Sequence, residues 1–298
     1  MRFQPRRFVL LALLGIPVGP PELSAQGPPA TDIYFATISQ RGNQIRLGTL
    51  ANLTDRPGYD NQPTFTPDGG AILYTSIRGD GQADTYRYDI ASGRTTRLTR
   101  TTESEYSPTV TPEGKTFSTV RVEADSAQRL WQFALDGSDP RLLLEHVAPV
   151  GYHAWGSEHV VGLFVLGTPP TLVLADIRSG DTTTLAHDIG RSLHTVPGRQ
   201  AVSFVHRESD TEVWIKEVDV ATRAIRPLVR PVGENEFYAW TPDGAILMGE
   251  GAKLYRWRPG TDQAWHEIVD LGSAGIESIS RLAVSPQGDR LAIVASRR

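Results

Sequence analysis

Residues 63–69 read Pro-Thr-Phe-Thr-Pro-Asp-Gly, and residues 108–114 read Pro-Thr-Val-Thr-Pro-Glu-Gly. The phrase returns at residues 239–244 as Ala-Trp-Thr-Pro-Asp-Gly and at residues 283–288 as Ala-Val-Ser-Pro-Gln-Gly. In each copy an aromatic or β-branched residue lies two positions before a proline, and a glycine lies two positions after it. Proline and glycine favour turn geometry, and the preceding residues favour strands. The phrase therefore predicts a strand that ends in a tight turn and recurs along the chain.

Two weaker copies, at residues 153–157 and 194–198, fill the gap between the second and third strong copies. The anchor positions are then 67, 112, 157, 197, 242 and 286, so the steps are 45, 45, 40, 45 and 44 residues. Repeats of this length that consist of short strands are typical of β-propellers, in which each repeat forms one four-stranded blade. The spacing predicts an all-β, six-bladed propeller.

The two ends of the chain are predicted to share the last blade. Residues 279–298 supply only two strands after the fifth repeat, and residues 32–54 contain two further strand-like segments. Pairing of the termini would close the ring and remove open sheet edges. We therefore expect a single propeller domain over residues 26–298.

The first 25 residues resemble an export signal. Arg2, Arg6 and Arg7 precede a short apolar run, and a small residue, Ala25, precedes the expected cleavage point. The run is too short to span a bilayer, so a cleaved signal is expected, with no integral membrane segment in the mature chain. We favour the Sec route over the twin-arginine route, and we expect a periplasmic or secreted protein.

Composition excludes several classes of protein. The 298 residues carry a formal net charge of −4 without long runs of one sign, which argues against a nucleic-acid partner. There are no cysteines, so disulfides, thiol catalysis and cysteine metal sites are excluded. The sequence also lacks a Gly-x-Ser-x-Gly nucleophile motif, a phosphate-binding glycine-rich loop and a His-Glu-x-x-His motif.

The recurring phrase, followed by an apolar strand, resembles the TolB-like, or PD40, repeats of bacterial propellers, which are related to WD40 repeats. The resemblance covers roughly residues 32–298 and is carried by the anchors at 67, 112, 242 and 286. It implies an extracytoplasmic six-bladed propeller that binds other proteins. TolB also has an N-terminal α/β domain, which is not expected here because the first strand follows the signal closely. The same repeats occur in prolyl-oligopeptidase-type peptidases beside a hydrolase domain that this sequence does not contain.

Candidate binding residues follow from propeller geometry, because the first strand of each blade lines the central channel. Residues that enter these strands are polar, of mixed charge and partly aromatic, as expected for a protein or peptide partner in the cell envelope. The candidates are Asp60, Asn61, Glu105, Tyr106, Tyr152, Arg191, Glu236 and Arg281. We favour a non-enzymatic binding protein with no catalytic residues, no cofactor and no metal site.

Two alternatives remain open. Asp60, Glu105 and His153 could hold a calcium or zinc ion at the channel, which would indicate a metal-assisted hydrolase or lyase of a small ester, lactone or saccharide. Exposed aromatic residues such as Trp265 could instead indicate a carbohydrate-binding module.

Overall fold

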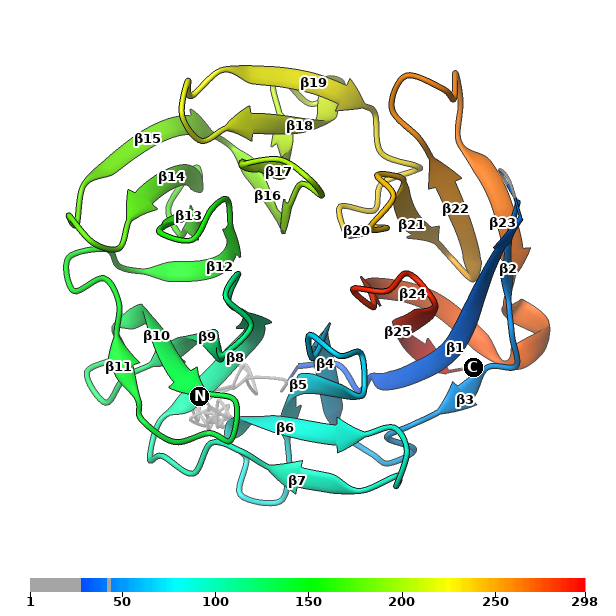
Figure 1. Cartoon of the computed structure of the whole chain (residues 1–298), viewed down its shortest axis with the longest axis horizontal. Helices are drawn as coiled ribbons and strands as arrows, with labels where there is room; N and C mark the ends of the chain where they lie inside the picture. Colours follow the sequence, from blue (N-terminus) through cyan, green and yellow to red (C-terminus); the bar gives the residue numbers. More distant parts are fainter. Residues whose placement is uncertain (1–27, 42–43, 298) are drawn as a thin grey trace, which may run out of the picture.

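The computed structural model describes residues 28–41 and 44–297, which form six antiparallel sheets arranged as a ring (Figure 1). The predicted all-β, six-bladed propeller is therefore confirmed. The expected signal at residues 1–25 lies outside the described residues. Within the described ranges, no helix has the length and hydrophobicity that a membrane crossing requires.

Five blades are continuous in sequence, and each contains four strands. The first two are β4 Tyr59–Phe65, β5 Ala71–Ile77, β6 Ala83–Asp89 and β7 Thr95–Arg97, and then β8 Ser104–Val110, β9 Thr116–Val122, β10 Gln128–Ala134 and β11 Arg141–Leu142. The third and fourth are β12 Val150–Trp155, β13 Val160–Val165, β14 Thr171–Asp176 and β15 Thr182–His187, and then β16 Ile189–Thr195, β17 Ala201–Arg207, β18 Val213–Asp219 and β19 Ile225–Val229. The fifth is β20 Tyr238–Trp240, β21 Ile246–Glu250, β22 Lys253–Trp257 and β23 His266–Asp270.

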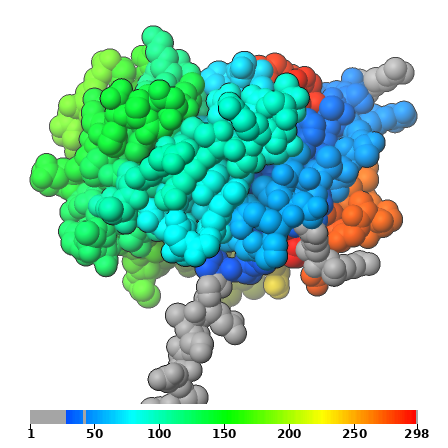
Figure 2. Space-filling view, turned by 90° about the horizontal axis from the view of Figure 1, so that it is seen from below, coloured from blue at the N-terminus to red at the C-terminus, as the bar shows by residue number. Residues whose placement is uncertain are grey.

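The sixth blade joins the two ends of the chain, as the sequence predicts. Its inner strands are β24 Ile276–Val284 and β25 Arg290–Arg297, and β1 Asp32–Arg41 pairs with β25 from Asp32 opposite Ala295 to Thr37 opposite Arg290. The outer edge is formed by β2 Gln44–Leu47 and β3 Ala51–Asn52, both paired with β1. In Figure 2 the blue N-terminal segment accordingly lies between the cyan first blade and the orange C-terminal region.

The recurring phrase forms the turn between the first and second strands of a blade. In the first copy, Thr66 is 3% exposed; its Oγ1 accepts a hydrogen bond from the Ala71 backbone N–H at 2.9 Å and donates to Asp68 at 2.7 Å. Gly69 takes a φ of +67°, which suits glycine. The hydroxyl and the glycine of the phrase are thus required by the turn itself.

The hydrophobic core lies between blades and not at the ring centre. Between the first and second blades, for example, Leu73 packs with Phe117 and Phe133, whose rings stack at a centroid distance of 5.4 Å. At the closing interface, Ile33 and Val294 pack in the same way against the first blade. Apolar side chains thus fill the interfaces between blades, and the residues of the inner strands form the channel wall.

Buried serines join neighbouring blades beside the channel. Ser118 of the second blade accepts a hydrogen bond from Trp155 Nε1 of the third at 3.0 Å. Ser203 of the fourth blade accepts from Trp240 Nε1 of the fifth at 2.8 Å and bonds Tyr238 Oη at 2.9 Å. Each tryptophan indole therefore fills a blade interface while its N–H has a partner.

Candidate functional site

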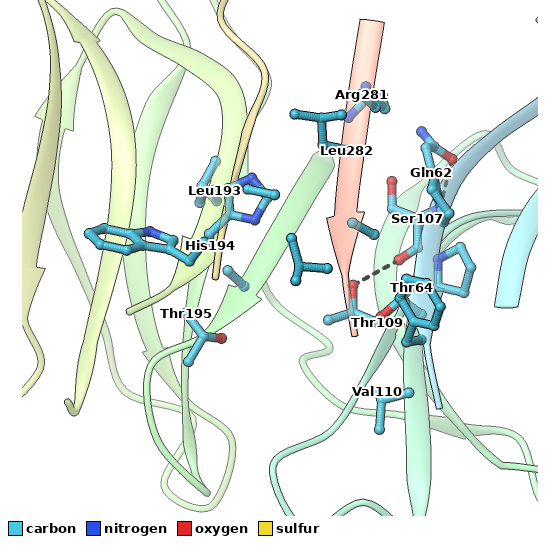
Figure 3. Close-up of a pocket in the computed structure, with 18 of the residues that line it drawn as sticks. Gln62, Thr64, Ser107, Thr109, Val110, Leu193, His194, Thr195, Arg281 and Leu282 are labelled. Atoms are coloured by element: carbon cyan, nitrogen blue, oxygen red, sulfur yellow. Dashed lines mark hydrogen bonds between the residues drawn. The ribbon is translucent and has the colours of Figure 1, made fainter. Parts of the chain in front are cut away.

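A cavity of about 630 Å³ occupies the ring centre and is lined by the first strand of every blade. At one end the wall consists of turn prolines, namely Pro67, Pro112, Pro197, Pro242 and Pro286. We call this the proline end. At the other end, where the first strands begin, the wall consists of polar and aromatic side chains, namely Gln62, Ser107, Tyr152, Arg191, Phe237 and Arg281. We call this the entry end. Figure 3 shows side chains from β4, β8, β16 and β24 on different sides of the cavity.

Bulges in the inner strands decide which residues reach the wall. In β4 the pairing with β5 shifts between Asn61 and Thr64, and Gln62 takes a positive φ of 57°. In β8 the equivalent shift occurs between Tyr106 and Thr109, and Ser107 has a φ of 55°. A bulge inserts a residue and turns the following side chains to a new direction. The channel wall of these blades therefore begins at Gln62 and Ser107.

Three of the eight sequence candidates, Tyr152, Arg191 and Arg281, line the cavity at the entry end. Arg281 Nη2 donates a hydrogen bond to Tyr152 Oη at 3.1 Å, and its guanidinium carbon lies 3.9 Å from the centroid of the Phe237 ring. Arg191 has a 63% exposed side chain, and its Nε lies 3.5 Å from Glu236 Oε1. The structure thus brings together cationic and aromatic groups from the third, fourth, fifth and sixth blades.

The carboxylates of Asp60 and Glu105 do not form part of the mouth, contrary to the sequence expectation. Both residues are fully buried, and each carboxylate forms an ion pair with a nearby arginine. Asp60 Oδ1 lies 2.8 Å from Arg56 Nη2, and Glu105 Oε1 lies 3.1 Å from Arg121 Nε. Because they precede the bulges, both side chains are directed into the protein. Burial raises the pKa of Glu105, against the opposing effects of Thr101 and Arg121.

The remaining candidates lie behind the wall. Asn61 is 6% exposed and donates to Thr31 Oγ1 at 3.2 Å. Tyr106 is half-buried, and burial raises the pKa of its phenol. The carboxylate of Glu236 binds Arg207 Nη2 at 2.6 Å and also accepts the Arg191 backbone N–H at 3.3 Å. Glu236 therefore positions Arg191 at the entry end and pairs with Arg207, and neither Glu236 nor Arg207 lines the cavity.

Two histidines line the cavity wall. His153 is 5% exposed, and its Nε2 lies 2.7 Å from Ser118 Oγ. Burial lowers the pKa of His153 to about 3. His194 is half-buried, bonds Ser192 Oγ at 3.0 Å and lies 4.7 Å from the Tyr238 ring. Burial, with a smaller effect from Arg281, lowers the pKa of His194 to about 4. Both imidazoles are therefore neutral near neutral pH.

The positions expected for the alternative sites are separated in space. Of the proposed metal ligands, His153 lines the cavity while Asp60 and Glu105 are held in ion pairs of other blades. Among the described residues, no group of three or more His, Asp or Glu side chains is arranged to hold a metal ion. Trp265 packs beside Trp257 at the outer part of the fifth blade and donates to the Arg230 carbonyl oxygen at 2.8 Å.

Phe237, His194 and Tyr238 line the cavity but were not among the eight candidate binding residues. The repeat carried a signal for Phe237. Positions 62, 107, 152, 237 and 281 each lie five residues before their anchor, and all five line the entry end. The position five residues before each anchor therefore predicts the wall residues better than the polar character of the segment that enters each strand.

No family model matches the sequence. Among solved structures, the fold is similar to that of a protein assigned as TolB from Agrobacterium tumefaciens, with a TM-score of 0.70 and 15% identity over 89% of this chain and 98% of that one. It is also similar to TolB from Acinetobacter baumannii, with a TM-score of 0.57 and 14% identity over 88% of this chain and 63% of that one. The fold is thus that of the TolB-like propellers, as the repeats indicated.

An enzyme shares the same architecture. An oligogalacturonate lyase in complex with manganese matches with a TM-score of 0.53 and 17% identity, over 85% of this chain and 76% of that one. At these identities the similarities establish the fold alone. Propellers of one fold carry different functions, which depend on the residues of the channel.

Proposed function

We propose that this protein is an exported, non-enzymatic propeller that binds a protein or peptide partner in the cell envelope through the entry end of its channel. The observation that carries the proposal is the cavity of about 630 Å³, whose entry end combines Arg191, Arg281, Tyr152 and Phe237. Arginine and aromatic residues dominate the energetics of protein interfaces. The similarity to TolB structures and the signal-like sequence at residues 1–25 support the same assignment.

The placement of the acidic residues favours binding over metal-assisted catalysis. Calcium requires oxygen ligands, and in proteins the charged oxygen ligands are carboxylates. Asp60 and Glu105, the carboxylates considered for this role, are already paired with Arg56 and Arg121 away from the cavity. Recruiting either to the channel would break a buried ion pair, which is strongly unfavourable.

Affinity capture from an envelope extract tests the proposal. The wild-type protein is compared with a channel variant that combines Tyr152→Ala, Arg191→Ala and Arg281→Ala. A matched control combines Arg94→Ala and Arg178→Ala, which removes two exposed arginines that do not line the cavity. We expect a defined partner to be retained by the wild type and the control and lost by the channel variant, with all three proteins equally folded. Equal retention by the channel variant would refute the assignment of the entry end.

A further inference from the structure

The charge of the cavity wall has one sign. The lining residues include Arg191 and Arg281 but no aspartate or glutamate. The two lining histidines do not add positive charge near neutral pH, because burial lowers the pKa of His153 to about 3 and that of His194 to about 4. The charge available to an occupant is therefore that of the two guanidinium groups.

The two arginines differ in how much of their charge is already neutralised. Arg191 shares the Glu236 carboxylate with Arg207, at 3.5 and 2.6 Å respectively. Arg281 forms no ion pair with any residue in the described part of the chain; its hydrogen bond is to Tyr152. A half-buried guanidinium without an acidic partner retains most of its five N–H donors and its full charge.

Aromatic rings hold the Arg281 guanidinium in place. Its central carbon lies 3.9 Å from the Phe237 centroid and 5.0 Å from the Tyr152 centroid. Such cation–π contacts orient the planar group while leaving its edges able to donate hydrogen bonds. These donors have no acidic partner among the described residues, and a planar carboxylate of a ligand fits the guanidinium fork in a bidentate manner.

Further hydrogen-bonding groups lie at the same end of the cavity. Ser107 is 8% exposed, and its Oγ is buried without a hydrogen-bond partner. Gln62 Oε1 accepts the Ser107 backbone N–H at 2.9 Å, and Figure 3 shows the Gln62 amide at the same end as Arg281. An unpartnered buried hydroxyl is costly unless a ligand or water satisfies it. Farther along the channel the wall is mixed, with Leu193, Leu282 and Val110 beside Thr64, Thr109 and Thr195.

We infer that the entry end recognises a carboxylate of an extended peptide segment, with Arg281 as the residue that binds it. The carboxylate is either a chain terminus or an Asp or Glu side chain. This inference rests on the proposed function and specifies the chemistry of the partner.

Retention of defined peptide pools by the immobilised full-length protein tests the inference. One pool of hexapeptides, whose random positions omit Asp and Glu, has a fixed Glu at the third position and an amidated C-terminus. A second has Gln in its place with the same amide, and a third has Gln with a free C-terminal carboxylate. We expect the wild type to retain the first or third pool about tenfold better than the second, because charge-assisted hydrogen bonds form only with the carboxylate. The pool that is preferred identifies the source of the carboxylate.

Arg281→Gln is expected to abolish this preference, and Arg281→Lys to keep part of it, because lysine retains the charge but not the fork. Arg94→Gln, an exposed change outside the cavity, serves as the matched control. Retention of all three pools to the same extent would overturn the carboxylate site while leaving a peptide-binding channel. Retention of none at millimolar peptide would also overturn it. Retention of galacturonate oligomers alone, lost in Arg281→Gln, would overturn both this inference and the proposed protein partner.

Discussion

Acid should destabilise this protein through His153. The imidazole is 5% exposed, Ser118 Oγ is the partner of its Nε2, and its Nδ1 has no partner. Protonation would therefore place a charge in the blade interface and leave an N–H without an acceptor. Burial accordingly lowers the pKa of His153 from 6.5 to about 3. In the unfolded chain the ordinary value applies, so the unfolded state binds a proton first as the pH falls.

The sign and size of the effect follow from linkage. Stability conferred by neutral His153 is complete above pH 6.5 and is lost progressively between 6.5 and about 3. A pH of about 5 lies about 1.5 units below the pKa of the imidazole in the unfolded chain. At 1.36 kcal/mol per unit, protonation of the unfolded state therefore lowers the free energy of unfolding by about 2 kcal/mol. This value does not depend on the exact folded pKa, provided that it lies well below 5. His194 is half-buried against the channel, where water can hydrate its charge, and should contribute less.

Urea unfolding at about pH 7.5 and pH 5 measures this effect when the wild type is compared with His153→Gln. Glutamine can still bond Ser118 but does not titrate. The wild type should lose about 2 kcal/mol more of its unfolding free energy than the variant over this interval. His146→Gln, at an exposed position, is the control and should follow the wild type. If His153→Gln and the wild type lose equal stability, the reasoning from burial is wrong.

Three further predictions concern stability, each measured by urea unfolding. Ile33→Ala, at 1% exposure in the closing blade, should cost about 2–4 kcal/mol, and a change within error would show that ring closure contributes little. Ser203→Ala removes the partner of Tyr238 and Trp240 and should cost about 1–3 kcal/mol; a neutral result would mean that water replaces the hydroxyl. Gly114→Ala should cost about 1 kcal/mol or more, because Gly114 has a φ of +70° and a Cβ would lie 3.1 Å from Pro67; a gain in stability would contradict the strained turn.

The sequence was sufficient for the fold because each blade is specified locally. The turn phrase requires its hydroxyl and glycine, and its spacing gives the number of blades, so the six blades and the closing blade followed from the repeat. The site was predicted less completely. Tyr152, Arg191 and Arg281 were placed correctly at the wall, but Asp60 and Glu105 were not.

The reason is a change in local backbone geometry that no residue pattern announces. Strand alternation assigns side chains to two faces, and a bulge reassigns every residue that follows it. Gln62 and Ser107 adopt positive φ values although neither is glycine, so their composition gave no indication of the bulge. The partners that neutralise Asp60 and Glu105 were equally hidden. Arg56 lies before β4, and Arg121 lies in the next strand of its blade, so only the folded sheet brings them to the carboxylates.

The closing blade also has a consequence for the order of folding. Five blades are built from consecutive hairpins, so their contacts join residues that are close along the chain and can form early. The sixth requires Ile33 to meet Val294, contacts that span nearly the whole sequence. A chain emerging during synthesis can complete five blades while β1 still lacks its partner, and the ring can close only after the last strand is released. A chain that lacks β25 would therefore keep β1 as an unpaired edge that is open to aggregation and proteolysis.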